Sequence, residues 1–295
     1  MQKLIRLRRA HPVAYSVAAG IVSVLLIMLS GLVVGMAASV LCPEADYYVL
    51  TLIQEALGFA LVFGVVWASG FSRVLRQRGC GFLRGLDVGL YPLVLITLVA
   101  IAGWVTARQE GLAFAPWYRM AAFSGTMLLI GLAEELPFRG LICGVLLERF
   151  GTDRAGIWKT VLLSGGIFGV AHLTNLLGAD PLGVFVQAAV ASVLGMLFAA
   201  IYLRTGNLWV TVVLHALMDF AGLLSTGLFE SGAGDAVADA ISSYGLINLL
   251  PVITYGIPTV FLLRKKKLHE IRALWTLQPA AGDSIVPQPT EAAGE

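Results

Sequence analysis

A small set of charged and imidazole side chains lies within hydrophobic stretches of this sequence. Glu134, Glu135 and Arg139 occupy the middle of the apolar segment 130–147. Each such group costs about 2.5–3.5 kcal/mol in hydrocarbon by insertion scales, so it usually faces a protein interior and serves a function. Glu135 and Arg139 are four residues apart, which puts them on one helix face where they can pair. Glu134 is rotated by about 100° and points elsewhere.

Two histidines also lie inside apolar segments. His172 closes the sequence Phe168-Gly-Val-Ala-His172, and Asn175 follows three residues later. His215 and Asp219 are four residues apart and would share one helix face. A single intramembrane His can simply bridge two helices by a hydrogen bond. Two of them, together with acids on three separate segments, would form one polar pocket if the segments converge.

Such a pocket suits hydrolysis of an amide bond in or near a membrane. If Glu135 neutralises the neighbouring Arg, Glu134 stays free to act as general base towards water. His172 would share or position that water. His215 and Asp219 would hydrogen-bond the oxyanion that forms when water attacks a carbonyl group.

Three other interpretations of these residues were open. Both acids can merely satisfy the buried Arg in a structural cluster. A divalent metal such as zinc suits two His and two carboxylates, although the HExxH spacing is absent. Its ligands would be Glu134, His172, His215 and Asp219. Serine hydrolysis is less favoured, because neither Ser164 nor Ser192 lies in a GxSxG setting.

The composition predicts an all-α, polytopic membrane helix bundle. The chain has 295 residues, of which 58% are hydrophobic and 13% charged, and its mean hydropathy is +0.85. Soluble domains contain about 25% charged residues. Cys42, Cys80 and Cys143 are far apart without a CxxC pair, which indicates free thiols.

Hydropathy and charge together predict about eight transmembrane helices with both termini cytoplasmic. Apart from Arg108, Arg119 and Arg139, every Lys and Arg falls on the same side when the predicted spans alternate, as the positive-inside rule requires. The predicted spans are 13–41, 48–70, 86–106, 117–147, 160–178, 183–203, 208–228 and 242–263. We expect access to the pocket from the cytoplasmic side or from the bilayer.

The domain organisation follows from these spans. Residues 1–277 form one transmembrane bundle with its motif-bearing core at 117–228. Residues 278–295, rich in Pro, Ala, Gly and acids, form a disordered tail. Residues 264–277 carry basic and apolar residues at helical spacing and either lie on the cytoplasmic leaflet or are a stop-transfer flank.

Three short motifs, in order on separate spans, resemble the CPBP family of intramembrane proteases: Glu134-Glu135-x-x-x-Arg139, Phe168-x-x-x-His172 and His215-x-x-x-Asp219. This family includes the type II CAAX prenyl endopeptidases and bacterial bacteriocin-processing or immunity proteins. The resemblance implies a glutamate-dependent endopeptidase that is an integral, multi-pass protein of a bacterial cell membrane. Its partners would be the lipid bilayer and a membrane-associated peptide or protein substrate, and not nucleic acid.

The resemblance also assigns roles to individual residues. Glu134 and His172 would activate water, and His215 with the residue at 219 would form the oxyanion side. The supporting residues would be Glu135, Arg139, Phe168 and Asn175. The family is often named metalloprotease, yet the motifs equally fit a metal-free mechanism. The family often has Asn where this chain has Asp219; an ionised Asp would repel an oxyanion, whereas a protonated one would donate to it.

Two function classes compete with a protease. A proton-coupled transporter would use the buried acids as relay sites, but an internal repeat is not evident and spans five and seven read as unbroken. A non-catalytic membrane scaffold or immunity factor would keep the pocket as structure.

Overall fold

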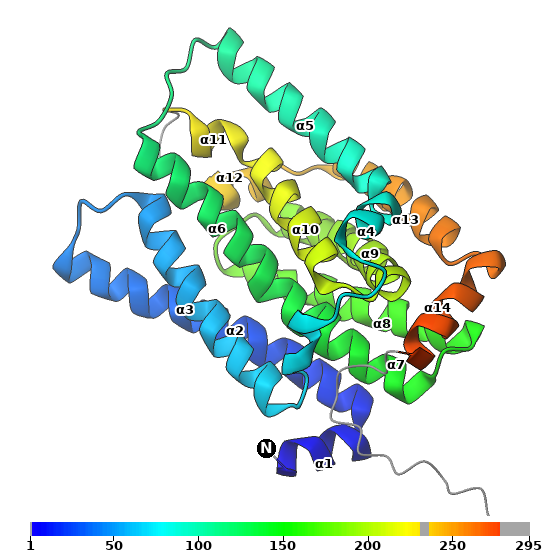
Figure 1. The fold of residues 1–295 in the computed structure, drawn as a ribbon. Coiled ribbons are helices and arrows are strands. Elements are labelled where there is room, and N and C mark those ends of the chain that lie inside the picture. Colours follow the sequence, from blue (N-terminus) through cyan, green and yellow to red (C-terminus); the bar gives the residue numbers. More distant parts are fainter. Residues whose placement is uncertain (1, 231–235, 278–295) are drawn as a thin grey trace, which may run out of the picture.

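The computed structural model describes residues 2–230 and 236–277, and these are almost entirely helical (Figure 1). The predicted all-α class is therefore confirmed, whereas the predicted disordered tail 278–295 lies outside the described residues. The α-helices are α1 (Gln2–Ala10), α2 (Pro12–Leu41), α3 (Tyr47–Ala68), α4 (Phe82–Val88), α5 (Leu90–Gln109), α6 (Trp117–Glu135), α7 (Gly144–Phe150), α8 (Arg154–Ala171), α9 (Pro181–Thr205), α10 (Leu208–Gly222), α11 (Leu224–Leu228), α12 (Ala236–Ser242), α13 (Leu250–Leu262) and α14 (Lys265–Leu277).

The described helices bear out a polytopic membrane bundle. Helices α2, α3, α5 and α9, and α8 with the 3₁₀ turn His172–Leu177 that follows it, are long and apolar enough to cross a bilayer. The segment Leu246–Leu262 and α14 add a sixth candidate that is bent by 69°. Predicted span four is α6, a π-helix (Leu136–Cys143) and α7 in unbroken succession, and predicted span seven is the shorter α10 followed by α11. The number eight and the cytoplasmic termini stay predictions.

Large apolar side chains cover the outer faces of the bundle. Leu32 on α2 is 60% exposed, and Leu98 on α5 is 57% exposed. A contiguous apolar surface of this kind is stable against lipid and unfavourable against water. The bilayer therefore completes the burial of these helices.

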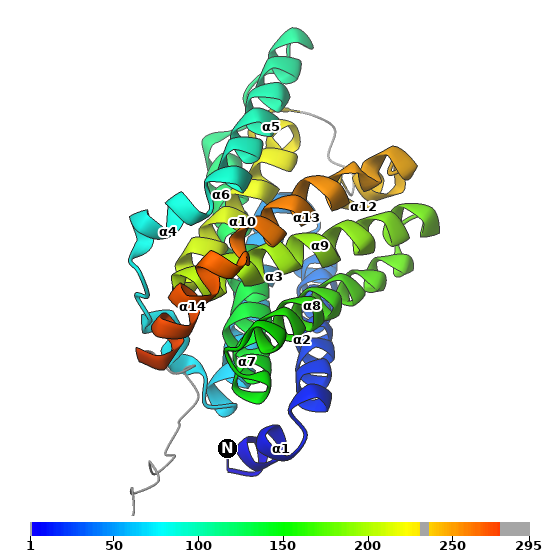
Figure 2. The same cartoon turned by 90° about the vertical axis from the view of Figure 1, so that its right-hand side faces the viewer.

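The helices that carry the motifs lie inside the bundle. Helix α6 packs between α3 and α10, and α9 packs against both α8 and α13 (Figure 2). Helices α8 and α9 approach closely because Gly165 and Gly169 face α9: a Cβ on them would lie 2.7 Å from the Ser192 carbonyl oxygen and 2.5 Å from that of Ala188. Small residues spaced by four are a usual means of close helix packing in membranes.

The two ends of the bundle differ in charge. Loops 42–46 and 110–116 lie at one end, at the left and upper left of Figure 1, and α1, α7 and α14 lie at the other. The first end carries acids such as Glu44 and Glu110, and the second carries the basic flanks of the predicted cytoplasmic side.

Helix α14 does not have a free apolar face for a lipid leaflet. Ile271 and Trp275 are buried against the bundle, and the Trp275 indole donates a hydrogen bond of 2.7 Å to the Leu203 carbonyl oxygen of α9. Hydrophobic spacing looks the same whether a helix packs on protein or on lipid. The prediction that this segment lies on the leaflet is therefore corrected.

Candidate functional site

The end of α6 holds a buried ion pair. Glu135 Oε1 lies 3.0 Å from Arg139 Nη1, and both side chains are fully buried. The Arg139 guanidinium also stacks over the Phe168 ring, 4.3 Å from its centre. Glu134, one residue earlier, has a side chain that is 27% exposed. The predicted division holds: Glu135 engages the arginine, and Glu134 faces open space.

The helix changes its winding directly after these acids. Residues Leu136–Cys143 form a π-helix that begins next to Pro137. Proline has no backbone N–H, so an α-helical hydrogen bond is already missing at this point. Wider π turns occur mostly as short insertions at functional sites, where they redirect side chains.

His215 joins α10 to this ion pair. Its Nδ1 atom donates a hydrogen bond of 2.8 Å to Glu135 Oε1, because a carboxylate paired with arginine can only accept. Its Nε2 atom lies 3.8 Å from Glu134 Oε2 and 3.6 Å from Asp219 Oδ2. The imidazole thus lies between a structural carboxylate and two carboxylates that face the cavity.

His172 is held from behind by its own helix. It is the first residue of the 3₁₀ turn His172–Leu177, in which α8 changes its winding. Its Nδ1 lies 2.9 Å from the Phe168 carbonyl oxygen, and a carbonyl only accepts, so Nδ1 carries the hydrogen. In the neutral imidazole, Nε2 is then an acceptor. The half-buried ring also contacts Phe168 edge to face, with 4.8 Å between centres.

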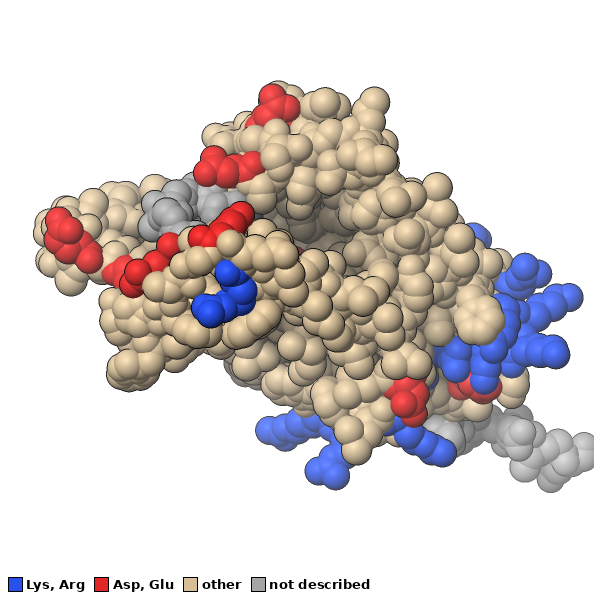
Figure 3. All heavy atoms as spheres, turned by 90° about the horizontal axis from the view of Figure 1, so that it is seen from above, with Lys and Arg blue, Asp and Glu red and all other residues tan. Residues whose placement is uncertain are grey.

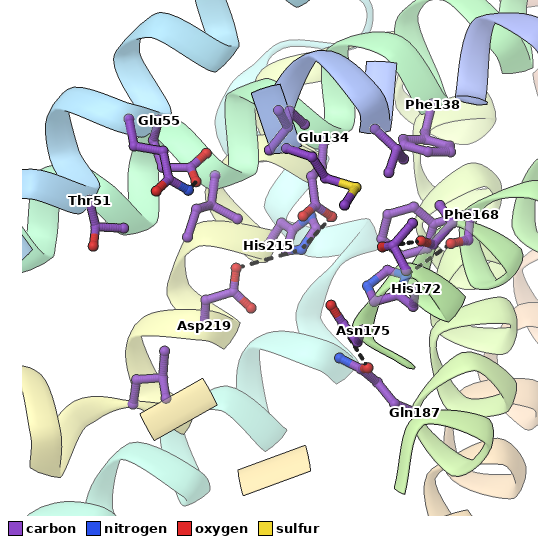
Figure 4. Close-up of a pocket in the computed structure, with 18 of the residues that line it drawn as sticks. Thr51, Glu55, Glu134, Phe138, Phe168, His172, Asn175, Gln187, His215 and Asp219 are labelled. Carbon is purple, nitrogen blue, oxygen red and sulfur yellow. Dashed lines mark hydrogen bonds and ion pairs between the residues drawn. The ribbon is translucent and has the colours of Figure 1, made fainter. Parts of the chain in front are cut away.

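These side chains share one cavity of about 590 Å³ between α2, α3, α6, α8 and α10. Figure 4 shows Glu134, His215 and Asp219 close together, with His172 and Asn175 across the cavity from Asp219. Asn175 donates a hydrogen bond of 2.8 Å to Gln187. The predicted catalytic residues therefore all line one pocket. Of the predicted supporting residues, Phe168 and Asn175 line it too, and the pair Glu135–Arg139 lies behind it.

A second cavity of about 390 Å³ meets the first at the two imidazoles and Asp219. It continues between α9, α10, α12 and α13, where Met218, Tyr244 and Tyr255 contribute to its walls. The two cavities therefore lead away from Asp219 and the two imidazoles in different directions. Gln187 lines both cavities and was not among the predicted site residues, although a glutamine within an apolar span is a usable signal.

Part of the wall of the first cavity lies at the acidic end of the bundle. Tyr47 and Thr51, from the first turns of α3, form part of its wall, as do Thr174 and Asn175 beyond the end of α8. Seen from above, the molecule is hollowed, with several acidic side chains towards the left of the hollow and basic side chains at the right and lower edges (Figure 3). This cavity therefore extends towards the end of the bundle opposite the basic flanks. Access from the cytoplasmic side or from the bilayer stays a prediction.

The donor set does not form a metal centre. Among the described residues, no three His, Cys, Asp or Glu side chains lie around one point that could hold an ion. His215 Nδ1 is hydrogen-bonded to Glu135, and its Nε2 lies 3.8 Å from Glu134 and 3.6 Å from Asp219, beyond the distance of shared ligands of one zinc ion. The predicted zinc ligands thus share a pocket without sharing a coordination geometry.

The comparison with protein families identifies the central part of the chain. Residues 116–221 match the family model described as type II CAAX prenyl endopeptidase Rce1-like. The match covers just over a third of the chain and contains all three motifs, so the predicted resemblance is confirmed. This is a family of proteases. Neither a curated protein nor a solved structure matches the chain.

Proposed function

We propose that this chain, with its Rce1-like segment at 116–221, is a membrane-embedded endopeptidase that hydrolyses a peptide bond with a water activated by Glu134. The observation that carries the proposal is the shared cavity. Glu134 is free of the arginine, faces that cavity, and lies beside His215 and across from His172.

In the first step, the two hydrogens of the water bond to two different acceptors. One water hydrogen goes to the Glu134 carboxylate, and the other is held by the Nε2 lone pair of His172. The oxygen then attacks the peptide carbonyl carbon while the proton moves to Glu134. The carbonyl π electrons become an oxyanion, and the anchoring of His172 on the Phe168 carbonyl keeps the acceptor nitrogen directed at the water.

The second step breaks the carbon–nitrogen bond. The oxyanion is stabilised by N–H or O–H donors on the opposite wall. These are Nε2–H of His215, which as an imidazolium donates from both ring nitrogens, and a protonated Asp219. When the intermediate collapses, Glu134 returns its proton to the leaving nitrogen. The products are a carboxylic acid and an amine, which leave as carboxylate and ammonium once the remaining water proton has passed from the acid to the amine, and Glu134 is again ionised.

The test is a cleavage assay with purified protein in liposomes and a quenched-fluorescent peptide library. Glu134→Gln and His172→Ala each lower the cleavage rate by at least about 100-fold, the usual value of a general acid–base group. The matched control is Glu148→Gln, an acid on α7 that pairs with Arg8 outside the cavity. If Glu134→Gln or His172→Ala folds normally and cleaves at the wild-type rate, the proposed function is wrong.

A further inference from the structure

Glu55 is a buried acid of the cavity that the proposed mechanism does not use. It lies on α3, outside the family-matched segment, and only 6% of its surface is exposed. Its Oε1 accepts a hydrogen bond of 3.2 Å from the adjacent Gln54. Figure 4 shows its side chain at the same cavity as Glu134 and Asp219.

No Lys or Arg side chain of the described residues lines this cavity, and His215 lies beside Glu134 and Asp219, at 3.8 and 3.6 Å. Arg139 is fully buried on Glu135 at 3.0 Å, so it belongs to the structural pair behind the wall. Glu55 therefore lines the same cavity as Glu134 and Asp219 without a Lys or Arg side chain in the cavity wall. A buried carboxylate without a cation is costly, and proteins retain one mainly where a ligand or partner offsets the cost.

A purely structural role explains Glu55 poorly. Its hydrogen bond partner is the neighbouring residue on the same helix, so the contact joins no two elements. Helix α3 also packs against the bundle through the buried residues Gly58, Val62 and Val66, so its packing does not depend on Glu55 alone. Glu55 instead lines the same cavity as Tyr47 and the acids of the site.

We propose that Glu55 is a specificity-determining residue that binds the ammonium or guanidinium group of a Lys or Arg side chain of the substrate, close to the scissile bond. This inference rests on the proposed function. The acidic side chains on one side of the hollow would attract a cationic segment, and a low-dielectric cavity strengthens the final contact. Gln54 holds the Glu55 carboxylate by donating to one oxygen and leaves the other for the substrate.

The first part of the test compares peptide substrates with the wild-type protein. Peptide sets are made in which each position in turn is fixed as Lys or as norleucine, which keeps the four-carbon chain and lacks the ammonium. Wild-type protein cleaves the Lys set at least about tenfold faster at one position, as expected for a charged hydrogen bond. Equal rates for Lys and norleucine at every position overturn the inference, and this outcome needs no variant that folds.

Variants then assign the preference to Glu55. Glu55→Gln, of nearly the same size, brings the Lys-to-norleucine ratio close to one, and Glu55→Lys shifts the preference at that position towards Glu. Glu44→Gln is the matched control, because Glu44 lies exposed before α3 and does not line the cavity; it keeps the ratio. A Glu55→Gln protein that retains the ratio overturns the inference while cleavage, and with it the proposed function, still stands.

Failure of the proposed function has a different signature. If wild-type protein cleaves no peptide of any set, the endopeptidase proposal falls, and the inference that rests on it falls as well. If wild-type protein cleaves and Glu134→Gln does not, the function holds whatever the result at Glu55.

Discussion

The Nδ1 atom of His215 lies 2.8 Å from Oε1 of Glu135, the same oxygen that faces Arg139. This one contact joins α6 to α10 and fixes which imidazole nitrogen faces the cavity. Because Nδ1 donates to Glu135, Nε2 is left for Glu134, Asp219 and the substrate. Glu135 is therefore the positioning residue through which a buried ion pair orients a side chain of the cavity.

Removing the charge of Glu135 should destabilise the bundle. In Glu135→Gln, Arg139 remains fully buried without a counter-charge, and breaking such a pair costs about 3–5 kcal/mol. The free energy of unfolding in mixed micelles measures the loss. The double variant Glu135→Leu with Arg139→Met removes both charges and should recover most of the stability. Equal losses in the single and double variants would contradict a role for the unpaired charge.

The residue at 219 should tolerate one substitution and not another. Asp219→Asn keeps a hydrogen bond donor beside His215 Nε2, so we expect cleavage within about tenfold of wild type. Asp219→Leu offers no donor and should lower the cleavage rate by about 10²–10³. Rates of the two variants on the same peptide decide the point. An inactive Asn variant would show that the proton or charge of Asp219, and not its hydrogen bond, is required.

The close approach of α8 and α9 should be sensitive to single methyl groups. Gly169→Ala places a Cβ within 2.5 Å of a backbone oxygen of α9, so the helices must move apart and His172 must move with α8. Overpacking of this kind costs about 1–3 kcal/mol. Thermal unfolding and cleavage rates provide the measurement. Gly166→Ala is the matched control, since a Cβ there meets nothing within 4 Å.

Chelation tests whether an ion takes part. The described donors do not gather around one point, and the water is held by Glu134 and His172 in the proposed mechanism. Protein treated with EDTA and reconstituted in metal-free buffer should therefore keep its cleavage rate. Loss of activity that Zn²⁺ restores would assign an ion to the cavity and replace the direct activation of water by Glu134.

The native cysteines report the side of the membrane towards which the first cavity extends. Cys42 is exposed in the acidic loop between α2 and α3, and Cys80 lies in the basic loop between α3 and α4. With the other two cysteines changed to Ser, an impermeant maleimide should label Cys42 on intact cells and Cys80 only after permeabilisation. The cavity would then extend away from the cytoplasm. Labelling of Cys80 on intact cells would reverse the orientation that the positive-inside rule predicts.

Local spacing determined much of this protein. Apolar runs interrupted by basic and acidic loops give the helices, and the four-residue spacing of Glu135 and Arg139 gives their pair, because helical periodicity is a property of the backbone. Glu134, His172, His215 and Asp219 could also be picked out from the sequence, because ionisable side chains are rare and costly within apolar segments.

Tertiary packing decided what spacing cannot. The hydrogen bond between His215 and Glu135 joins residues 80 positions apart, and Glu55 reaches the cavity only because α3 packs against α6. The same packing places α14 on α9. Hydrophobic patterns show that a face is buried but not which partner buries it, so these relationships exist only once the helices have chosen their neighbours.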